Sequence, residues 1–183
     1  MSNNMRNLVS KSVLRQDRGM TLVELMASMG IAAAVMVSAL ALYNTANDTQ
    51  KSNQMIQDIE SLRSATKQLY SGQGNYSGMN NGLLISAGKV PTTLRTDAAA
   101  KTITSRDGYS VAITPGAVVG VRQTFDITLT GAPAVMCQEI ATRFVGYISL
   151  KIGAAAANTV LPITPADAET QCAAAGTIVL NSY

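Results

Sequence analysis

The chain has 183 residues, of which 47% are hydrophobic, 14% charged and 4% aromatic. This composition is typical of a folded protein rather than a disordered one. The chain contains no histidine, so it cannot by itself build a Ser/His, Cys/His or histidine–zinc site, and enzymes of those classes are excluded.

The net charge of +3 originates in the N-terminal segment. Four basic residues and one acid lie within the first 19 positions, and the rest of the chain holds ten basic and ten acidic residues. Proteins that bind nucleic acids concentrate Lys and Arg on one face. The charge pattern therefore gives no support to a dedicated nucleic-acid-binding domain.

The segment from Leu25 to Tyr43 is almost wholly apolar or small, and no charged residue lies between Glu24 and Asp48. As an α-helix, these 19 residues span ~29 Å, close to the hydrocarbon thickness of a bilayer. Basic residues precede the segment. The positive-inside tendency therefore places the N-terminus in the cytoplasm and the remainder of the chain outside.

This N-terminal segment allows three processing outcomes. A signal peptidase could cut after Ala41 and release a soluble domain beginning at Leu42, or the segment could remain as an uncleaved anchor. In the third outcome, a cut before the apolar segment removes the basic leader and keeps the helix. Glu24 favours the third outcome, because a carboxylate costs roughly 2.5 to 3.5 kcal/mol near the centre of a membrane helix and less toward its end. Neither a signal peptide nor an anchor requires it.

The sequence Gly19-Met20-Thr21-Leu22-Val23-Glu24, between a basic leader and an apolar helix, resembles the processing motif of type IV prepilins. The resemblance implies that a prepilin peptidase cuts after Gly19 and methylates the new N-terminus, Met20. It also implies that Glu24 pairs with the amino terminus of a neighbouring subunit during assembly. Met20 and the 19-residue leader resemble the type IVb subclass.

Beyond Tyr43 the chain becomes more polar but keeps an apolar row at helical spacing: Met55, Ile59, Leu62 and Leu69. Residues 31–71 contain neither proline nor glycine, and Gly72 is a plausible stop. The sequence therefore predicts one continuous helix over residues 20–71.

The expected organisation has four parts. A leader peptide, residues 1–19, is removed by the prepilin peptidase. Residues 20–47 form the hydrophobic transmembrane and filament-core helix, and residues 48–71 form its amphipathic half. Residues 72–183 form a globular head with a disulfide-bounded C-terminal region.

Within the head, short patterns predict elements in chain order. We expect a helical turn within residues 83–91, a hairpin of residues 101–105 and 109–113 around Asp107-Gly108, and a strand over 123–130. A helix follows over 134–145, with Val135 or Met136, Ile140 and Phe144 facing inward. A second helix begins at Thr164 and Pro165 and continues to Ala175, and residues 177–180 form an inner strand.

Cys137 and Cys172 each lie on one of the two predicted head helices, in a compartment where disulfides persist. A bridge across their separation of 35 positions would constrain the unfolded chain by ~4 kcal/mol. A redox-active pair is the alternative. The absence of a C-x-x-C motif and of an evident activating base favours a structural disulfide. The segment from Ile163 to Cys172 resembles the second-cysteine region of bundle-forming pilins.

Patterns that indicate catalysis are missing. There is no glycine-rich phosphate loop, and the paired acids Asp58/Glu60 and Asp167/Glu169 are two positions apart and point to different helix faces. We therefore expect no enzymatic activity, no cofactor and no metal site.

The resemblance implies an α+β fold, the type IV pilin fold, in which the C-terminal half of a long N-terminal helix packs on an antiparallel β-sheet head. It implies a structural subunit that is stored in the bacterial inner membrane and polymerises into an extracellular pilus, or fimbrium. The expected partners are copies of itself, the prepilin peptidase and the pilus assembly machinery. Adhesion, bacterial aggregation and conjugative mating contact are the expected uses, with no receptor indicated by the sequence. The alternatives are a minor pilin, a type II secretion pseudopilin, or a secreted soluble binding domain.

Overall fold

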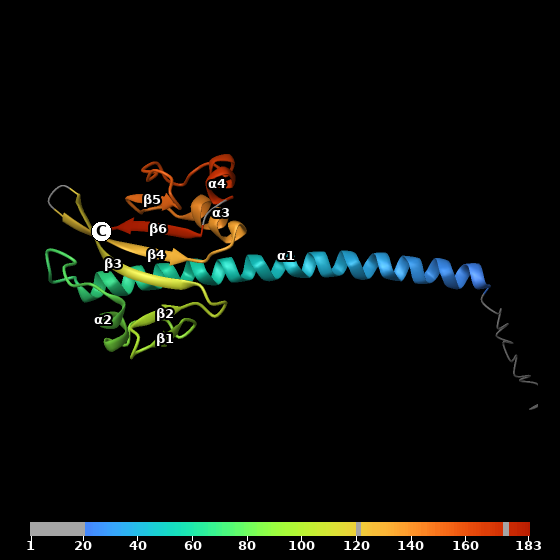
Figure 1. The fold of residues 1–183 in the computed structure, drawn as a ribbon, viewed down its shortest axis with the longest axis horizontal. Coiled ribbons are helices and arrows are strands. Elements are labelled where there is room, and N and C mark those ends of the chain that lie inside the picture. Colours follow the sequence, from blue (N-terminus) through green and yellow to red (C-terminus); the bar gives the residue numbers. More distant parts are fainter. Residues whose placement is uncertain (1–20, 120–121, 174–175) are drawn as a thin grey trace, which may run out of the picture. The chain divides into compact units, whose positions relative to one another are not determined.

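The computed structural model describes residues 21–119, 122–173 and 176–183. Gly19 and Met20 therefore lie outside the described residues. Contacts between residues divide the chain into two compact units, residues 1–43 and residues 44–183. Within the described residues, the second unit contains all six strands and three complete helices (Figure 1).

Helix α1 extends from Leu22 to Leu69 and passes through the boundary between the two units. The hydroxyl of Thr21 caps its first turn by accepting a hydrogen bond from the N–H of Glu24 at 3.3 Å. The predicted C-terminus at residue 71 is two positions too late. The helix ends at Leu69, ahead of a glycine-rich turn that begins near Gly72.

The head contains one six-stranded antiparallel sheet. Its strands are β1 (Arg95–Asp97), β2 (Thr102–Thr104), β3 (Ser110–Val119), β4 (Arg122–Thr130), β5 (Ser149–Ile152) and β6 (Thr177–Ser182). Their order across the sheet is β1-β2-β3-β4-β6-β5. The C-terminal strand β6 is therefore an inner strand, as predicted, and joins β5 to the rest of the sheet.

The strands present their apolar side chains to one face. Val111 of β3, Leu129 of β4 and Ile178 of β6 lie directly opposite one another in register and are buried. The next inward row contains Ile113, Ile127 and Leu180 in the same way. The alternate positions face the other side, where most residues are partly or fully exposed. Alternation of buried and exposed side chains along each strand is typical of a sheet that has one face covered by other elements and the other face in solvent.

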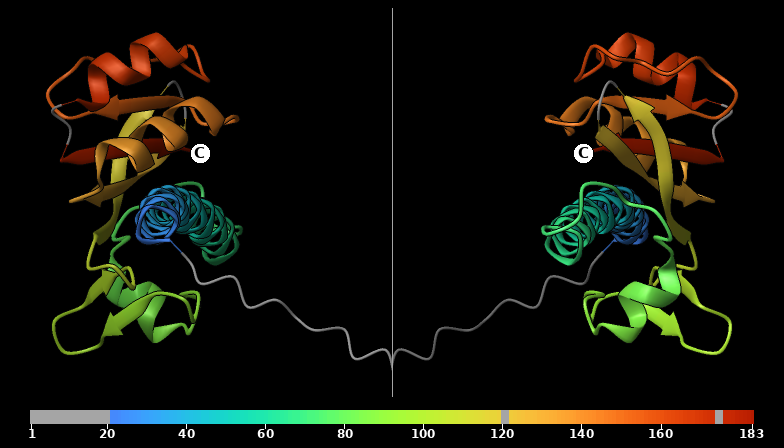
Figure 2. Two further views of the ribbon diagram at one scale, coloured as in Figure 1. Left: turned by 90° about the vertical axis from the view of Figure 1, so that its right-hand side faces the viewer. Right: turned by 90° about the vertical axis from the view of Figure 1, so that its left-hand side faces the viewer.

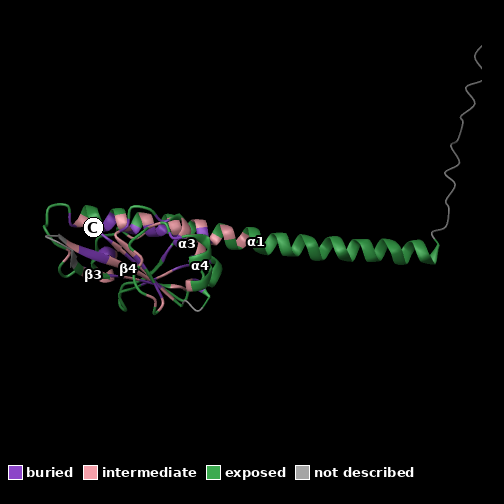
Figure 3. Ribbon diagram, turned by 90° about the horizontal axis from the view of Figure 1, so that it is seen from above, coloured by how far each residue is buried: buried purple, intermediate pink, exposed green. Residues whose placement is uncertain are grey.

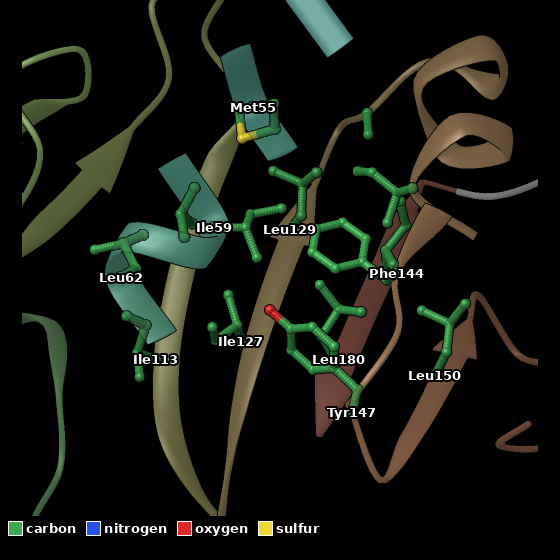
Figure 4. Packing of buried hydrophobic residues seen from close by; sticks show 14 of the residues in the cluster. Met55, Ile59, Leu62, Ile113, Ile127, Leu129, Phe144, Tyr147, Leu150 and Leu180 are labelled. Atoms are coloured by element: carbon green, nitrogen blue, oxygen red, sulfur yellow. The ribbon is translucent and has the colours of Figure 1, made fainter. Parts of the chain in front are cut away.

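The C-terminal half of α1 covers the apolar face. Met55, Ile59 and Leu62 are at most 3% exposed and join the inward rows of the sheet in one core (Figure 4). In Figure 2 the C-terminal half of α1 lies on one side of the sheet strands. Burial of an aliphatic side chain stabilises a fold by about 1.5 to 3 kcal/mol. This apolar stripe therefore fixes the second half of α1 to the head.

Three short helices complete the head. Helix α2 (Asn81–Ser86) confirms the predicted helical turn, and Asn80 caps it. Helix α3 (Ala134–Arg143) contributes Met136 and Ile140 to the core. Helix α4 (Pro165–Cys172) begins at the predicted cap, where the Thr164 hydroxyl accepts from the N–H of Asp167. The helix ends at Cys172 with Ala173 as its C-cap, so the predicted end at residue 175 is three positions too late.

The structure differs from the sequence-based expectations at several positions. Strands β1 and β5 have no counterpart among the predicted elements, because each is short and lies at an edge of the sheet. Strand β3 continues past Pro115 through an irregularity in its pairing with β4, where a Cβ at Gly116 would lie 2.4 Å from the Thr124 hydroxyl. Of the two alternatives at the start of α3, Met136 is buried and Val135 is 52% exposed.

Candidate functional site

The N-terminal half of α1 is an uninterrupted run of exposed residues. Residues 21–46 are all exposed (Figure 3), and large side chains such as Val23 and Leu42 have exposed fractions of 75% and 72%. Among the described residues, α1 is the one helix long and apolar enough to cross a membrane. Monomeric soluble proteins rarely leave apolar patches of this extent uncovered. The segment therefore requires lipid or other protein around it.

Glu24 is the one charged residue between Leu22 and Asn47. Its side chain is exposed and forms no ion pair with any described residue. Its position in the first turn of α1 is favourable, because the N-terminal end of a helix attracts negative charge. An uncovered carboxylate in an apolar segment can accept a cationic partner from another molecule.

Arg63 joins the second half of α1 to the C-terminal part of the head. Its Nε donates a 2.9 Å hydrogen bond to the Ser182 hydroxyl in β6, and its guanidinium donates to the carbonyl of Gly146. The guanidinium also lies 4.2 Å from the ring centre of Tyr147 and 3.5 Å from a Glu60 oxygen. One side chain thus contacts the α3–β5 loop and the final strand.

The side chain of Tyr147, which lies beneath the Arg63 guanidinium, is buried, with an exposed fraction of 8%. Burial raises the pKa of its phenol, and the nearby Glu60 carboxylate raises it further. The phenol of Tyr147 therefore stays neutral. Its ring packs edge-on against the ring of Phe144, with 5.1 Å between the two ring centres.

A disulfide joins Cys137 in α3 to Cys172 in α4. Their Cα atoms are 5.7 Å apart, within the usual range for a disulfide, and both residues are buried. The bridge closes a loop that contains β5. It therefore constrains the edge of the sheet at which α4 lies.

An open groove of about 600 Å³ lies between α1, the segment before β1, the β2–β3 turn and Met136 of α3. Its lining residues are polar for the most part: Asn47, Gln50, Lys51, Gln54, Met55, Asp58, Thr92, Thr93, Arg95, Ser105, Arg106, Asp107 and Met136. Lys51 and Asp107 form an ion pair across it at 3.3 Å. Asp58, 5% exposed, accepts hydrogen bonds from the Thr93 hydroxyl and the Gln54 amide.

The structure does not bring the predicted site residues together into one site. Glu24 is exposed on the first turn of α1, and Cys137 and Cys172 form a disulfide in the head. Gly19 and Met20 lie outside the described residues. Sequence reasoning missed Arg63 and the groove, because each depends on contacts between residues far apart in the chain. Within the described residues there is no cluster of side chains suited to hold a metal ion.

Comparison with protein families gives two matches. A family model described as PilS N terminal matches residues 49–183. A second model, described as the prokaryotic N-terminal methylation motif, matches residues 14–40. The second match includes Gly19, Met20 and Glu24.

Two curated relatives are each named the major structural subunit of bundle-forming pilus, from Escherichia coli O127:H6 (strain E2348/69 / EPEC) and from Escherichia coli O111:H-. Each is 28% identical over an alignment of 183 positions, which covers 90% of this chain and 93% of the relative. The alignment therefore spans most of both chains.

Two solved structures share the fold. The crystal structure of a type IV b pilin from Salmonella typhi superposes with a TM-score of 0.58 at 22% identity, covering 72% of this chain and 98% of that one. The structure of TcpA, a type IV pilin from the Vibrio cholerae El Tor biotype, gives a TM-score of 0.50 at 17% identity, covering 73% and 99%. These similarities confirm the predicted α+β architecture.

Proposed function

Because this chain belongs to the PilS N-terminal family and is a type IVb pilin, we propose that it is cut between Gly19 and Met20 and polymerises through its N-terminal helix. In this proposal the helix over residues 20–47 first spans the inner membrane and then forms the filament core. The head, residues 72–183, forms the outer surface with the amphipathic segment 48–71 attached to it. The role is structural rather than catalytic.

The observation that supports the proposal most strongly is the uncovered apolar surface of residues 21–46. Burial of each large aliphatic side chain is worth about 1.5 to 3 kcal/mol, so association of several such helices supplies a large driving force once they leave the lipid. Small residues such as Ala33, Ala34 and Ser38 are frequent in this half. They allow close approach between neighbouring helices.

Glu24 supplies the specificity that apolar contacts lack. A carboxylate within an apolar bundle is costly unless a cation pairs with it. The new amino terminus at Met20 is such a cation, and Met20 lies only four positions before Glu24. Because both groups lie near the same end of the helix, pairing between neighbouring copies sets a short and fixed axial offset.

The proposed partners follow from this route. The prepilin peptidase acts on the leader, the assembly machinery of the inner membrane extracts the pilin, and further copies of the same chain form the filament. Cell adhesion, bacterial aggregation and conjugative mating contact are all compatible with such a filament. The name of the curated relatives, a major structural subunit, favours an abundant subunit over a minor pilin or a pseudopilin.

The test is the substitution Glu24→Ala in the producing strain. The pilin in the sheared surface fraction is quantified relative to total cellular pilin. We expect at least about a tenfold loss of surface filaments with normal cellular pilin, since tenfold corresponds to about 1.4 kcal/mol and loss of the partner of a buried charge exceeds that. Asp48→Ala, which removes another exposed acid of α1, is the matched control. Normal filaments at a normal rate in Glu24→Ala would contradict the proposed role of Glu24.

A further inference from the structure

The groove beside the second half of α1 combines two buried methionines with polar walls. Met55 of α1 and Met136 of α3 line it and are 3% and 2% exposed. Most of its other lining residues carry hydroxyl, amide or charged groups. Its volume of about 600 Å³ lies within the range of small-molecule sites, although such sites are usually lined by apolar side chains. A ligand that matches this groove is therefore itself rich in polar groups.

Asp58, on the wall that α1 forms, has one uncommitted carboxylate oxygen. The residue is 5% exposed, and the hydrogen bonds that it accepts from Thr93 and Gln54 both go to Oδ1. Its Oδ2 has no hydrogen-bond partner among the described residues. A nearly buried carboxylate oxygen without a donor is unfavourable. A ligand group that donates a hydrogen bond to Oδ2 in the groove is therefore stabilised there.

Ser105 presents an unused donor on the wall that the β2–β3 turn forms. The residue is 5% exposed and lines the groove. Its hydroxyl oxygen accepts a 3.0 Å hydrogen bond from the N–H of Tyr109, and its proton has no acceptor within the part of the chain that the structure describes. A serine hydroxyl can donate and accept at the same time. The head therefore leaves one acceptor and one donor unused on two different walls of the groove.

The groove has a net positive charge of one. Its charged residues are three cations and two acids: Lys51, Arg95, Arg106, Asp58 and Asp107. Lys51 and Asp107 form an ion pair at 3.3 Å. Arg95 and Arg106 are exposed and form no ion pair with any described residue. This balance favours a ligand with a single negative charge.

The two free arginines and Asp58 lie within reach of one small molecule. Thr104 lies opposite Arg95 in the β1–β2 pairing, and Arg106 follows Thr104 by two positions. Thr93, which donates to Asp58, lies two positions before Arg95, a separation of at most ~7 Å along the backbone. Arginine matches a carboxylate with two parallel N–H donors. A carboxylate at the arginines therefore leaves Asp58 for a hydroxyl group of the same ligand.

We propose that the groove binds a sugar acid, a compound with one carboxylate and several hydroxyl groups. The carboxylate pairs with Arg95 and Arg106. One ligand hydroxyl donates to Asp58 Oδ2, and another accepts from Ser105. A neutral sugar leaves both arginines unpaired, and a simple carboxylate leaves Asp58 Oδ2 without a donor. The site lies within the head of a single molecule, so the inference goes beyond the proposed function and does not depend on polymerisation.

The first test measures binding to full-length, detergent-solubilised pilin by saturation-transfer NMR. The probes are sodium D-glucuronate, D-glucose, which lacks the charge, and sodium acetate, which lacks the hydroxyl groups. We expect glucuronate to bind with a dissociation constant of about 1 mM, the affinity that a typical ligand of about 13 non-hydrogen atoms reaches. Glucose and acetate should each bind at least about tenfold more weakly, because each loses hydrogen bonds to charged groups.

Matched variants locate the site. Arg95→Gln/Arg106→Gln should weaken glucuronate binding at least about tenfold. Lys89→Gln/Lys151→Gln removes the same charge at two exposed residues outside the groove and is expected to leave the affinity unchanged. Urea unfolding and the intact disulfide report whether each variant folds.

A third variant separates the two halves of the ligand. Asp58→Asn keeps the size of the side chain and an oxygen that accepts from Thr93, but it replaces the free acceptor with an amide N–H donor. This variant should weaken glucuronate binding without weakening acetate binding. A purely structural role of Asp58 would not produce this difference between the two probes.

Methyl β-D-glucuronide distinguishes two sources of the same chemistry. It models a uronic acid residue at the end of a glycan, whereas glucuronate models a free sugar acid. Equal affinities would assign the groove to glycan ends as well as to free sugar acids. Binding of glucuronate alone would restrict it to free sugar acids.

The results divide clearly. Saturable glucuronate binding that the arginine variant weakens and the lysine control keeps supports the site. No saturable binding up to about ten times the expected dissociation constant, or an equal loss in the lysine control, would overturn it. Acetate binding as tight as that of glucuronate would also overturn the assignment to a sugar acid. None of these results affects the role of the N-terminal helix, which the Glu24→Ala test addresses separately.

Discussion

The two halves of α1 both carry apolar residues in helical conformation, but only the second half buries them within its own chain. Leu40 in the first half is 63% exposed, whereas Leu62 in the second half is 0% exposed. In the second half the apolar residues form a stripe with polar residues around it, and in the first half they surround the helix. A stripe can be covered by one sheet. A helix that is apolar on every side requires neighbours on every side.

The comparison indicates that one helix serves two separate purposes. The second half stabilises the head of a single molecule, and in the proposed filament the first half provides the surface for contacts between molecules. Substitutions in the two halves should therefore change different measurable quantities.

The largest expected effect concerns the head alone. Cys137→Ser with Cys172→Ser removes the disulfide and should lower the free energy of unfolding of the head by about 4 kcal/mol, the loop-entropy value for 35 residues. Urea unfolding of detergent-solubilised pilin, followed by tyrosine fluorescence, measures this. Helicity of the apolar half should not change. A head of unaltered stability would show that α3 and α4 are held by packing alone.

The same substitution at two positions of α1 sharpens the comparison. Leu62→Ala should lower the free energy of unfolding of the head by about 2 to 5 kcal/mol, because it leaves a cavity in the core. Leu40→Ala should change it by less than about 0.5 kcal/mol and should instead lower the temperature at which purified pili dissociate. Equal effects of both substitutions on head unfolding would contradict a division of roles along α1.

A smaller effect is expected at Arg63, which links α1 to β6 and to the α3–β5 loop. Arg63→Ala should lower the free energy of unfolding of the head by about 1 to 3 kcal/mol, because the buried Ser182 hydroxyl loses the hydrogen bond that it accepts from Arg63. Arg63→Lys keeps the charge but cannot reproduce the two-sided geometry, so an intermediate value is expected. Hydrogen exchange at the β6 amides should rise in the same order. If Arg63→Lys and Arg63→Ala give the same free energy of unfolding and the same exchange rates at the β6 amides, the positive charge at this position does not contribute to stability.

The smallest effect is expected at the ion pair between Lys51 and Asp107, whose side chains are 37% and 33% exposed. Exposed pairs contribute about 0 to 1 kcal/mol and are screened by salt. Lys51→Met should therefore destabilise the head by less than about 1 kcal/mol in low salt and by nothing measurable at 1 M NaCl. A larger loss that persists at 1 M NaCl would contradict an exposed, salt-screened ion pair at this position.

Local patterns predicted much of this fold from the sequence. The long helix, the Asp107-Gly108 hairpin, the alternating strand β4 and the Thr164-Pro165 helix start each depend on residues close together in the chain, and the structure contains all four. Strands β1 and β5 escaped prediction because three or four residues at a sheet edge have no distinctive pattern. Their positions are determined by pairing with β2 and β6.

The candidate sites also divide into those with a local sequence pattern and those that depend on contacts between distant residues. The roles of Gly19, Met20 and Glu24 stay predictions, which the sequence supplies because a processing motif depends on the order of residues along the chain. Arg63 gave no such signal, since its partners lie 83 and 119 positions away. The two free arginines of the groove became apparent only when the ion pairs of the folded head were known.

The most direct test of the account is N-terminal sequencing with intact mass measurement on pilin from the sheared surface fraction and from the culture medium. The account predicts filament protein that begins at a methylated Met20 and keeps both the apolar half of α1 and the disulfide. A soluble chain that begins at Leu42 in the medium, with no filament form, would contradict it. The apolar half would then be a discarded signal peptide, and the head a secreted domain.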